Sequence, residues 1–237
     1  MNLRRITERV WLSDFEKERD RPGIGYVLGD RWKLCVDAGH SGMHTMEFYA
    51  ALKDAGLPPP DLTVLTHWHW DHTFGMHAVH GMTIASTTTA DHLRQIKNEI
   101  EQDGPEQFFQ MDESIRLEYA GTRDVVVTLP DLLFEGEMQL DLGNCPVRLF
   151  RCESPHTDDC TLVHVLREKV LFLGDAAGGV FPTWEKDPVM AFRLAHAIEG
   201  LDAEICIRSH YPPEAKQALL DDLYATTSPK KPDTSKT

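Results

Sequence analysis

The sequence predicts a layered α/β fold, and two kinds of pattern support this class. Short apolar runs of strand length recur along the chain, and most of them are rich in β-branched residues. Longer stretches with helical patterns lie between these runs. Strands and helices that are mixed along one chain form domains in which helices cover the faces of sheets. The 237 residues, of which 41% are apolar, are enough for one substantial core.

The elements follow from these patterns in chain order. Each predicted strand is a short apolar run, and the runs cover residues 25–28, 34–36, 62–65, 125–128, 147–150, 161–166, 170–173 and 205–207. Each predicted helix is a longer periodic stretch, and these cover residues 43–55, 73–79, 88–100, 188–198 and 214–224. Residues 98–124 are rich in charge and aromatic side chains, which indicates an insertion of helical character. It would serve either as a lid or pocket wall or as an ordinary packed amphipathic helix.

Charge argues against a nucleic-acid substrate. The 24 basic and 38 acidic residues give a formal net charge of −14, which repels a polyanion unless a basic patch offsets it. The densest basic run, Lys230 and Lys231 with Lys236, falls in the tail "SPKKPDTSKT". The composition of that tail predicts disorder over residues 228–237 and a single domain over residues 1–227.

Other features of the chain favour a cytoplasmic protein that acts on a small molecule. The N-terminal residues contain no apolar run typical of a secretory signal. No stretch approaches the roughly eighteen apolar residues that span a bilayer, so no membrane association is expected. The five cysteines form an odd, scattered set without a CxxC pair, which is typical of reduced thiols.

Two predicted strands end alike, each in an aspartate followed by small residues. These are "LCVDAG", which contains Asp37, and "LFLGDA", which contains Asp175. The connections that follow strands are where α/β proteins commonly place functional groups. The pair is consistent with two similar halves.

The stretch "THWHWDH", residues 66–72, predicts a metal site. In an extended chain, alternation directs His67 and His69 to one side and the two tryptophans, 68 and 70, to the other, where we expect them to pack and hold the loop rigid. Asp71 and His72 then lie at the turn into a helix. These nitrogen and oxygen donors suit zinc, iron or manganese. The alternative is that the groups are unrelated, but burying three imidazoles without a shared cation would desolvate each polar atom.

The order His-x-His-x-Asp-His after an apolar strand resembles the signature of the metallo-β-lactamase fold superfamily of hydrolases. The resemblance implies three further positions downstream, and the sequence has them in order: His156 in "SPHTDD", Asp175 in "LFLGDAAGG" and His210 in "IRSHYPP". It spans about residues 24–212. It implies a four-layer αβ/βα sandwich of two mixed β-sheets flanked by helices.

The resemblance also implies a division of roles at a dinuclear site. One metal ion would be bound by His67, His69 and His156, and the other by Asp71, His72 and His210, with Asp175 bridging the two. Asp37 would support the site through hydrogen bonds without binding metal. Two divalent ions about 3.5–4 Å apart share a hydroxide that serves as the nucleophile. We expect zinc, with iron or manganese as alternatives, and we expect Asp71 to pass a proton to the leaving group.

The aspartate at position 175 limits the classes of reaction that the resemblance implies. Zinc β-lactamases usually have cysteine or a non-bridging residue there, whereas aspartate is typical of related thioesterases, lactonases and phosphodiesterases. β-Lactam hydrolysis is therefore disfavoured. The short segment after His210 disfavours a glutathione thioesterase, and the acidic charge disfavours RNA processing. A small ester, thioester or lactone is the favoured substrate. The alternatives are a phosphodiesterase and a persulfide dioxygenase of the same superfamily that uses a single iron.

The loop after Asp175 supplies candidate pocket walls. Phe181 and Trp184 would form apolar walls of a substrate pocket, or else pack in the core beneath the loop. Gly178 and Gly179 would permit close approach of the backbone. Histidines 40 and 44 follow Asp37 closely and are candidates for a position near the site. We expect the remaining histidines to have structural roles: 77, 80, 92, 164 and 196.

Overall fold

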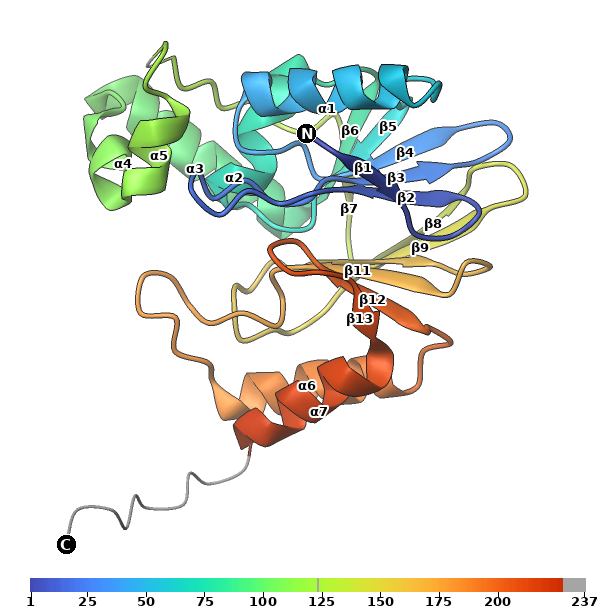
Figure 1. Ribbon diagram of the computed structural model, residues 1–237. Helices are drawn as coiled ribbons and strands as arrows, with labels where there is room; N and C mark the ends of the chain where they lie inside the picture. The colour runs from blue at the N-terminus through green and yellow to red at the C-terminus, as the bar shows by residue number, and fades with distance from the viewer. Residues whose placement is uncertain (123, 228–237) are drawn as a thin grey trace, which may run out of the picture.

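Two β-sheets pack face to face and carry helices on their outer faces, as Figure 1 shows for the computed structural model. The structure describes residues 1–122 and 124–227. The predicted disordered tail, residues 228–237, lies outside the described residues. This arrangement confirms the four-layer α/β sandwich.

The first sheet has seven strands in the spatial order β1 to β7. Neighbours from β1 to β4 pair antiparallel, and neighbours from β4 to β7 pair parallel. The strands are β1 Leu3–Arg5, β2 Val10–Ser13, β3 Gly25–Leu28, β4 Lys33–Val36, β5 Leu62–Val64, β6 Met82–Ser86 and β7 Leu132–Phe134. Parallel neighbours require crossover connections. Those connections contain α1 Gly42–Asp54, α2 Trp70–Thr73, the 3₁₀ helix η1 Phe74–Ala78, α3 Thr87–Asp103, α4 Glu106–Met111 and α5 Glu113–Glu118.

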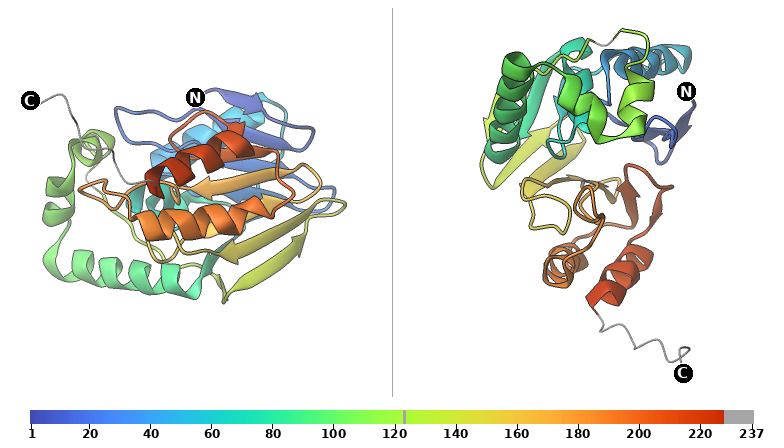
Figure 2. Two further views of the ribbon diagram at one scale, coloured as in Figure 1. Left: turned by 90° about the horizontal axis from the view of Figure 1, so that it is seen from below. Right: turned by 90° about the vertical axis from the view of Figure 1, so that its left-hand side faces the viewer.

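The second sheet has six strands in the order β13-β12-β11-β10-β9-β8, and only β11 and β12 pair parallel. The strands are β8 Glu137–Asp141, β9 Pro146–Arg151, β10 Thr161–Val165, β11 Val170–Gly174, β12 Ile205–Arg208 and β13 Glu214–Ala215. The helix α6 Pro188–Glu199 joins β11 to β12, and α7 Lys216–Thr227 follows β13. The two helices lie side by side across this sheet (Figure 2).

Three apolar layers hold the sandwich together. Valines such as Val36 and Val163 meet between the sheets, Phe48 of α1 packs on the outside of the first sheet, and Leu194 of α6 packs on the outside of the second. Every residue of β10 and β11 is buried. A strand covered on both faces needs mostly apolar side chains on both, which explains why β11 is a continuous apolar run and β10 is apolar apart from Thr161 and His164.

Polarity and short length explain why two strands were not predicted. Strand β8 alternates between exposed and half-buried residues, and β7 is apolar but has only three residues, of which the two leucines are exposed. The predicted strand at residues 125–128 is wrong: this segment has no regular structure, and only Val127 in it is buried. A short run of β-branched residues forms a strand only where a neighbouring strand can pair with it.

Two further predictions bear on the setting of the chain. All five cysteines are free. None of the helices within residues 1–122 and 124–227 is long and apolar enough to cross a membrane.

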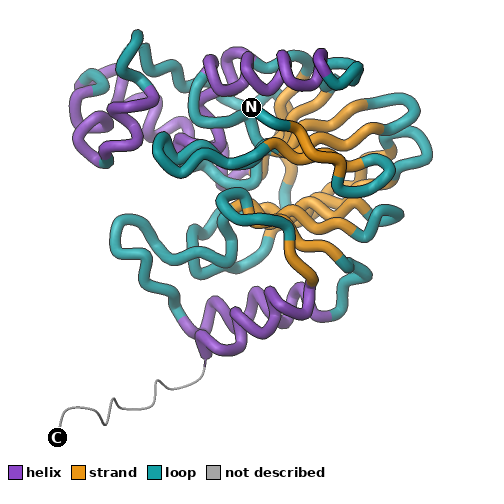
Figure 3. Tube along the Cα trace, in the orientation of Figure 1, coloured by secondary structure: helices purple, strands orange, loops and turns teal. Residues whose placement is uncertain are grey.

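Long loops leave the strands on one side of both sheets, and Figure 3 shows them in teal. Five of these loops carry the residues described below, and they comprise residues 14–24, 65–69, 152–160, 175–187 and 209–213. The face-to-face packing of the sheets brings these loops together, although they are far apart in the sequence.

Candidate metal centre

The motif at residues 66–72 is a loop that turns into a helix. Strand β5 ends at Val64, and α2 begins at Trp70 with His69 as its N-cap. The side chains of His67, His69 and His72 are all buried. The bend at residues 66–68 and the start of α2, and not strand alternation, bring these imidazoles together.

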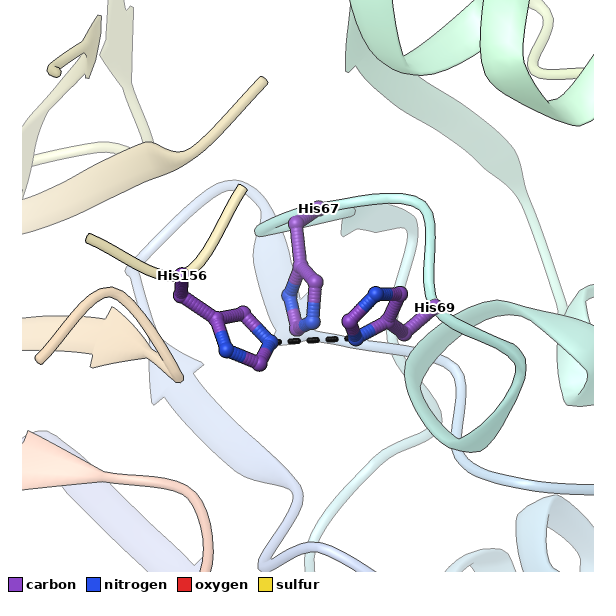
Figure 4. Close-up of side chains that lie close together, drawn as sticks. All are labelled: His67, His69 and His156. Carbon is purple, nitrogen blue, oxygen red and sulfur yellow. Dashed lines mark hydrogen bonds between the residues drawn. The ribbon is translucent and has the colours of Figure 1, made fainter. Parts of the chain in front are cut away.

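The first group of candidate ligands is three histidines that point toward one another (Figure 4). His67 and His69 come from the loop after β5, and His156 comes from the loop between β9 and β10. Nε2 of His156 lies 3.0 Å from Nδ1 of His69. One ligand atom from each side chain lies within 4.8 Å of the others.

The chemistry of this first group fits a cation. Nε2 of His67 is buried and has no hydrogen-bond partner among the described residues. Burial and the neighbouring histidines lower the pKa of His67 well below its usual value and lower the pKa of His69 to about 3. Neutral imidazoles with converging lone pairs are the ligands that zinc prefers. A cation would satisfy the nitrogen that the protein leaves without a partner.

The second group combines two carboxylates with two histidines: Asp71, His72, Asp175 and His210. Oδ2 of Asp71 lies 3.0 Å from Nε2 of His210 and 3.1 Å from Nε2 of His72. Oδ2 of Asp175 lies 3.4 Å from Nε2 of His210, 3.6 Å from that of His72 and 4.0 Å from Nε2 of His156 in the first group. Asp175 therefore lies between the two groups.

Charge in the second group is balanced by protons that metal ions can replace. Burial favours the neutral form of His210, but Asp175, Asp71 and Asp20 outweigh it and raise the pKa of that imidazole to about 9. Burial likewise opposes the charged form of Asp71, but His72 and His210 hold the pKa of this carboxyl well below its usual range. Metal ions compete with protons for such donors. Two carboxylates beside two imidazoles thus form a set suited to a divalent cation.

Asp37 lies behind the second group and makes three hydrogen bonds. Its Oδ1 accepts from the backbone N–H of Thr66 at 2.8 Å, and its Oδ2 accepts from Oγ1 of Thr66 at 2.9 Å and from Nδ1 of His72 at 2.8 Å. The carboxylate is buried, and its backbone is left-handed with φ of 68°. A carboxylate that binds the outer nitrogen of a histidine fixes the tautomer and turns the inner nitrogen toward a metal.

A cavity of about 580 Å³ opens over both groups. Phe181 and Trp184 both line it, together with Gly178 and Gly179. Six further residues line the cavity that the sequence patterns did not single out: Phe15, Lys17, Asp20, Lys186, Arg208 and Tyr211. Arg208 and Tyr211 flank His210, so their closeness in the chain was a usable signal. No pattern in the sequence relates Lys17 or Asp20 to the site, because the loop at residues 14–24 reaches it only through the fold.

The tryptophans of the motif differ from each other. Trp70 lines the cavity, so the prediction that it only packs behind the loop is wrong. The chain enters α2 at this residue, so strand alternation no longer applies to it. The ring of Trp70 also packs against Phe108 and Phe181. Trp68 contacts the rings of His69 and His92 and is not part of the cavity wall.

The structure also locates the remaining candidate histidines. His40 and His44 are buried behind the site and do not line the cavity; Nδ1 of His40 donates to the carbonyl of Arg19 at 2.9 Å. His92 lies 2.7 Å from Oδ1 of Asp158 and, with Asp158 and Asp159, forms a third group of possible donor atoms.

Comparison with known proteins identifies the family. Residues 26–210 match the sequence profile of the metallo-β-lactamase superfamily. The chain belongs to this superfamily. The match includes every candidate ligand from His67 to His210, and it supports reading the two groups as the metal centre of a superfamily enzyme.

Several solved structures resemble the chain in fold. A metallo-β-lactamase from Pontibacter korlensis has a TM-score of 0.68 at 19% identity, covering 95% of this chain and 98% of that one. The DIM-1 metallo-β-lactamase has a TM-score of 0.67 at 20% identity, covering 96% and 97%. A double mutant of the sec-alkyl sulfatase PisA1 has a TM-score of 0.71 at 14% identity, covering 94% of this chain and 41% of that one. A search of curated proteins found no match.

Replacing His92 with alanine is expected to leave metal content and hydrolysis nearly unchanged. The side chain is one-third exposed and its contact with Asp158 is a surface pair, which contributes little to stability. Metal analysis of the purified variant, together with its turnover rate, checks this. The loss of one ion per chain would instead show that the third group binds metal.

Proposed function

We propose that this superfamily member is a dinuclear metal-dependent hydrolase of a small ester, thioester or lactone. The observation that carries the proposal is the position of the Asp175 carboxylate between two donor groups beneath one cavity. A carboxylate at that point can bind two ions at once. Aspartate, and not cysteine, at this position favours a hydrolase other than a β-lactamase.

The candidate ligands divide between two ions. His67, His69 and His156 would hold one ion, His72 and His210 with Asp71 would hold the other, and Asp175 would bridge them. Two divalent ions bound in this way lower the pKa of water to near neutrality and polarise the oxygen of the bond to be broken. We propose zinc, because the first group offers only imidazole nitrogen.

The protein's own groups then orient the reaction and move protons. Asp71 lines the cavity, so its carboxylate is placed to relay a proton to the leaving group. Nδ1 of His156 donates to the carbonyl of Gly179 at 2.7 Å, which leaves Nε2 of this histidine directed at the first group. Asp37 does the same for His72. These contacts preorganise the donors before substrate binds.

The cavity suits a small substrate with an apolar part. Its volume of about 580 Å³ is that of a site for a small molecule. Three aromatic residues, Trp70, Phe181 and Trp184, supply apolar surface near the first group. Lys17 adds positive charge to the wall and suits a substrate with a carboxylate, whereas Lys186 and Arg208 pair with Asp222 and Glu214 of the protein. A nucleic acid or a membrane is not expected as a partner.

Metal analysis combined with a substrate screen tests the proposal. The screen comprises lactones, thioesters, phosphodiesters and β-lactams, and also alkyl sulfates because a sec-alkyl sulfatase shares the fold. We expect two zinc ions per chain, turnover of an ester, thioester or lactone, loss of activity with a chelator and recovery with zinc. One iron per chain with oxygen uptake on a persulfide would refute the proposal in favour of the dioxygenase.

Replacing Trp184 with alanine is expected to raise KM by up to about tenfold and to leave kcat nearly unchanged. The indole lines the cavity, stacks on His156 and is 56% exposed, so its loss removes contact area for the substrate at little cost to the core. Steady-state kinetics with the best substrate measure this. Trp32, an exposed tryptophan that does not line the cavity, is the matched control. An unchanged KM would contradict a role for Trp184 in binding.

A further inference from the structure

Three of the five candidate histidine ligands have an outer ring nitrogen beside a polar partner. Nδ1 of His72 donates to Asp37, Nδ1 of His156 donates to the carbonyl of Gly179, and Nδ1 of His67 lies 3.2 Å from the hydroxyl of Thr66. Each of these contacts holds the opposite nitrogen of its ring toward a donor group.

Asp20 lies beside the outer ring nitrogen of His210. Nε2 of His210 faces the two carboxylates of the second group, and Nδ1 of the same ring lies 3.5 Å from Oδ1 of Asp20. Asp20 belongs to the loop at residues 14–24, which precedes the region matched by the superfamily profile. It therefore lies outside the part of the chain that the superfamily profile covers.

The loop is held against the segment that carries His210. The backbone N–H of Gly23 donates to the carbonyl of Ser209 at 2.7 Å. Glu16 and Arg21 pair through two backbone hydrogen bonds of 2.9 Å each, which closes the turn on which Asp20 sits. Asp20 has a left-handed backbone with φ of 49°, a conformation that aspartate and asparagine tolerate better than most residues.

A buried ion pair anchors this turn to the helical insertion. Nε and Nη2 of Arg21 donate to the two carboxylate oxygens of Glu118 at 2.7 and 3.0 Å, and both side chains are almost fully buried. Glu118 is the last residue of α5 and also accepts a hydrogen bond from Ser41. A bidentate pair of this kind sets both distance and angle. The segment at residues 98–124 thereby reaches the turn that carries Asp20.

We infer that Asp20 is a positioning residue for His210 and that the buried pair of Arg21 and Glu118 sets its place. By charge attraction across 3.5 Å, the Asp20 carboxylate favours a proton on Nδ1 of His210 and so keeps Nε2 directed at the second metal ion. The helical insertion, residues 98–124, thereby fixes the position of the loop at residues 14–24, and we call this contact the brace. This inference rests on the proposed dinuclear site.

The first test replaces Asp20 with asparagine and measures zinc affinity, not turnover. Asparagine keeps the size of the side chain and tolerates the backbone conformation, but it removes the negative charge. Competition of the zinc-loaded protein with a chromophoric chelator is expected to show the dissociation constant of one site raised about 10–100-fold, with the other site unchanged. Glu18→Gln removes one charge from an exposed position in the same loop and is expected to match the parent protein.

The second test addresses the brace. Glu118→Gln is expected to weaken the same site, and combining it with Asp20→Asn is expected to weaken that site no further, because both changes remove one interaction. Arg21→Lys keeps the charge but loses the bidentate contact, and it serves if Glu118→Gln does not fold. A purely structural role for the pair would lower the melting temperature of either variant without changing zinc affinity.

The measured zinc content and affinities distinguish a failure of the role of Asp20 from a failure of the proposed dinuclear site. A parent protein that binds fewer than two zinc ions would refute the dinuclear site itself. Two zinc ions in the parent, with equal affinities in Asp20→Asn, would leave the dinuclear site in place and overturn the role of Asp20. Additive effects of Asp20→Asn and Glu118→Gln would overturn the brace.

Discussion

Alanine in place of Asp175 is expected to lower hydrolysis by more than about 100-fold and to lower metal content at the same time. The reason is its position between the two groups, where Oδ2 lies 3.4–4.0 Å from the Nε2 atoms of His210, His72 and His156. Without this carboxylate the second group keeps a single acidic ligand, Asp71. Metal analysis by mass spectrometry and steady-state kinetics on the same preparation measure both effects.

A matched control separates the site from general loss of charge. Asp202→Ala also removes a carboxylate, but this side chain is 80% exposed and pairs with Lys169 on the surface. It is expected to retain metal and activity. Full activity in Asp175→Ala would show that this carboxylate does not bridge two ions.

Asparagine in place of Asp37 is expected to lower the free energy of unfolding by about 2–3 kcal/mol and to weaken zinc binding about 10–100-fold. The carboxylate accepts three hydrogen bonds in the protein interior. An amide has one oxygen, so at least one buried donor, from Thr66 or His72, faces an NH₂ group. Asparagine also tolerates the left-handed backbone at this position, so the change reports on hydrogen bonding.

Denaturant unfolding of the metal-free and zinc-loaded protein distinguishes the two effects of Asp37→Asn. The loss in the metal-free protein measures the hydrogen bonds alone. A larger loss in the zinc-loaded protein measures weaker metal binding, because a ligand that binds the folded state adds to its stability. Asp54→Asn, an exposed aspartate at the end of α1, is the control. Equal zinc affinities in Asp37→Asn and the parent protein would contradict the orienting role.

Local patterns account for much of the fold. The buried strands β3, β10 and β11 were predicted to within a residue, because strands covered on both faces must be largely apolar. The polar strand β8 and the three-residue strand β7 were not predicted, because the first lacks an apolar run and the second is too short to stand out. A strand at the edge of a sheet is specified by the neighbour that it pairs with, and this partner cannot be read from a local window.

The candidate site was likewise predicted only in part from local patterns. His67, His69, Asp71 and His72 lie within six residues, so their spacing alone indicated a metal site. The choice of His156, Asp175 and His210 depended on the resemblance to a family, since a histidine or aspartate in a distant loop carries no local sign of its role. The face-to-face packing of the sheets brings these three to the first cluster.

Residue types and their order along the chain predicted a layered α/β fold and, together with the family resemblance, the set of candidate metal donors, because buried strands and metal ligands both demand particular chemistry. The orientation of Trp70 and the role of the loop at residues 14–24 required the folded protein. Trp70 faces the cavity because the chain turns into α2 at that residue. Asp20 meets His210 because Arg21 and Glu118, from distant parts of the sequence, pair in the interior. Contacts of this kind depend on the complete chain path, which no single segment encodes.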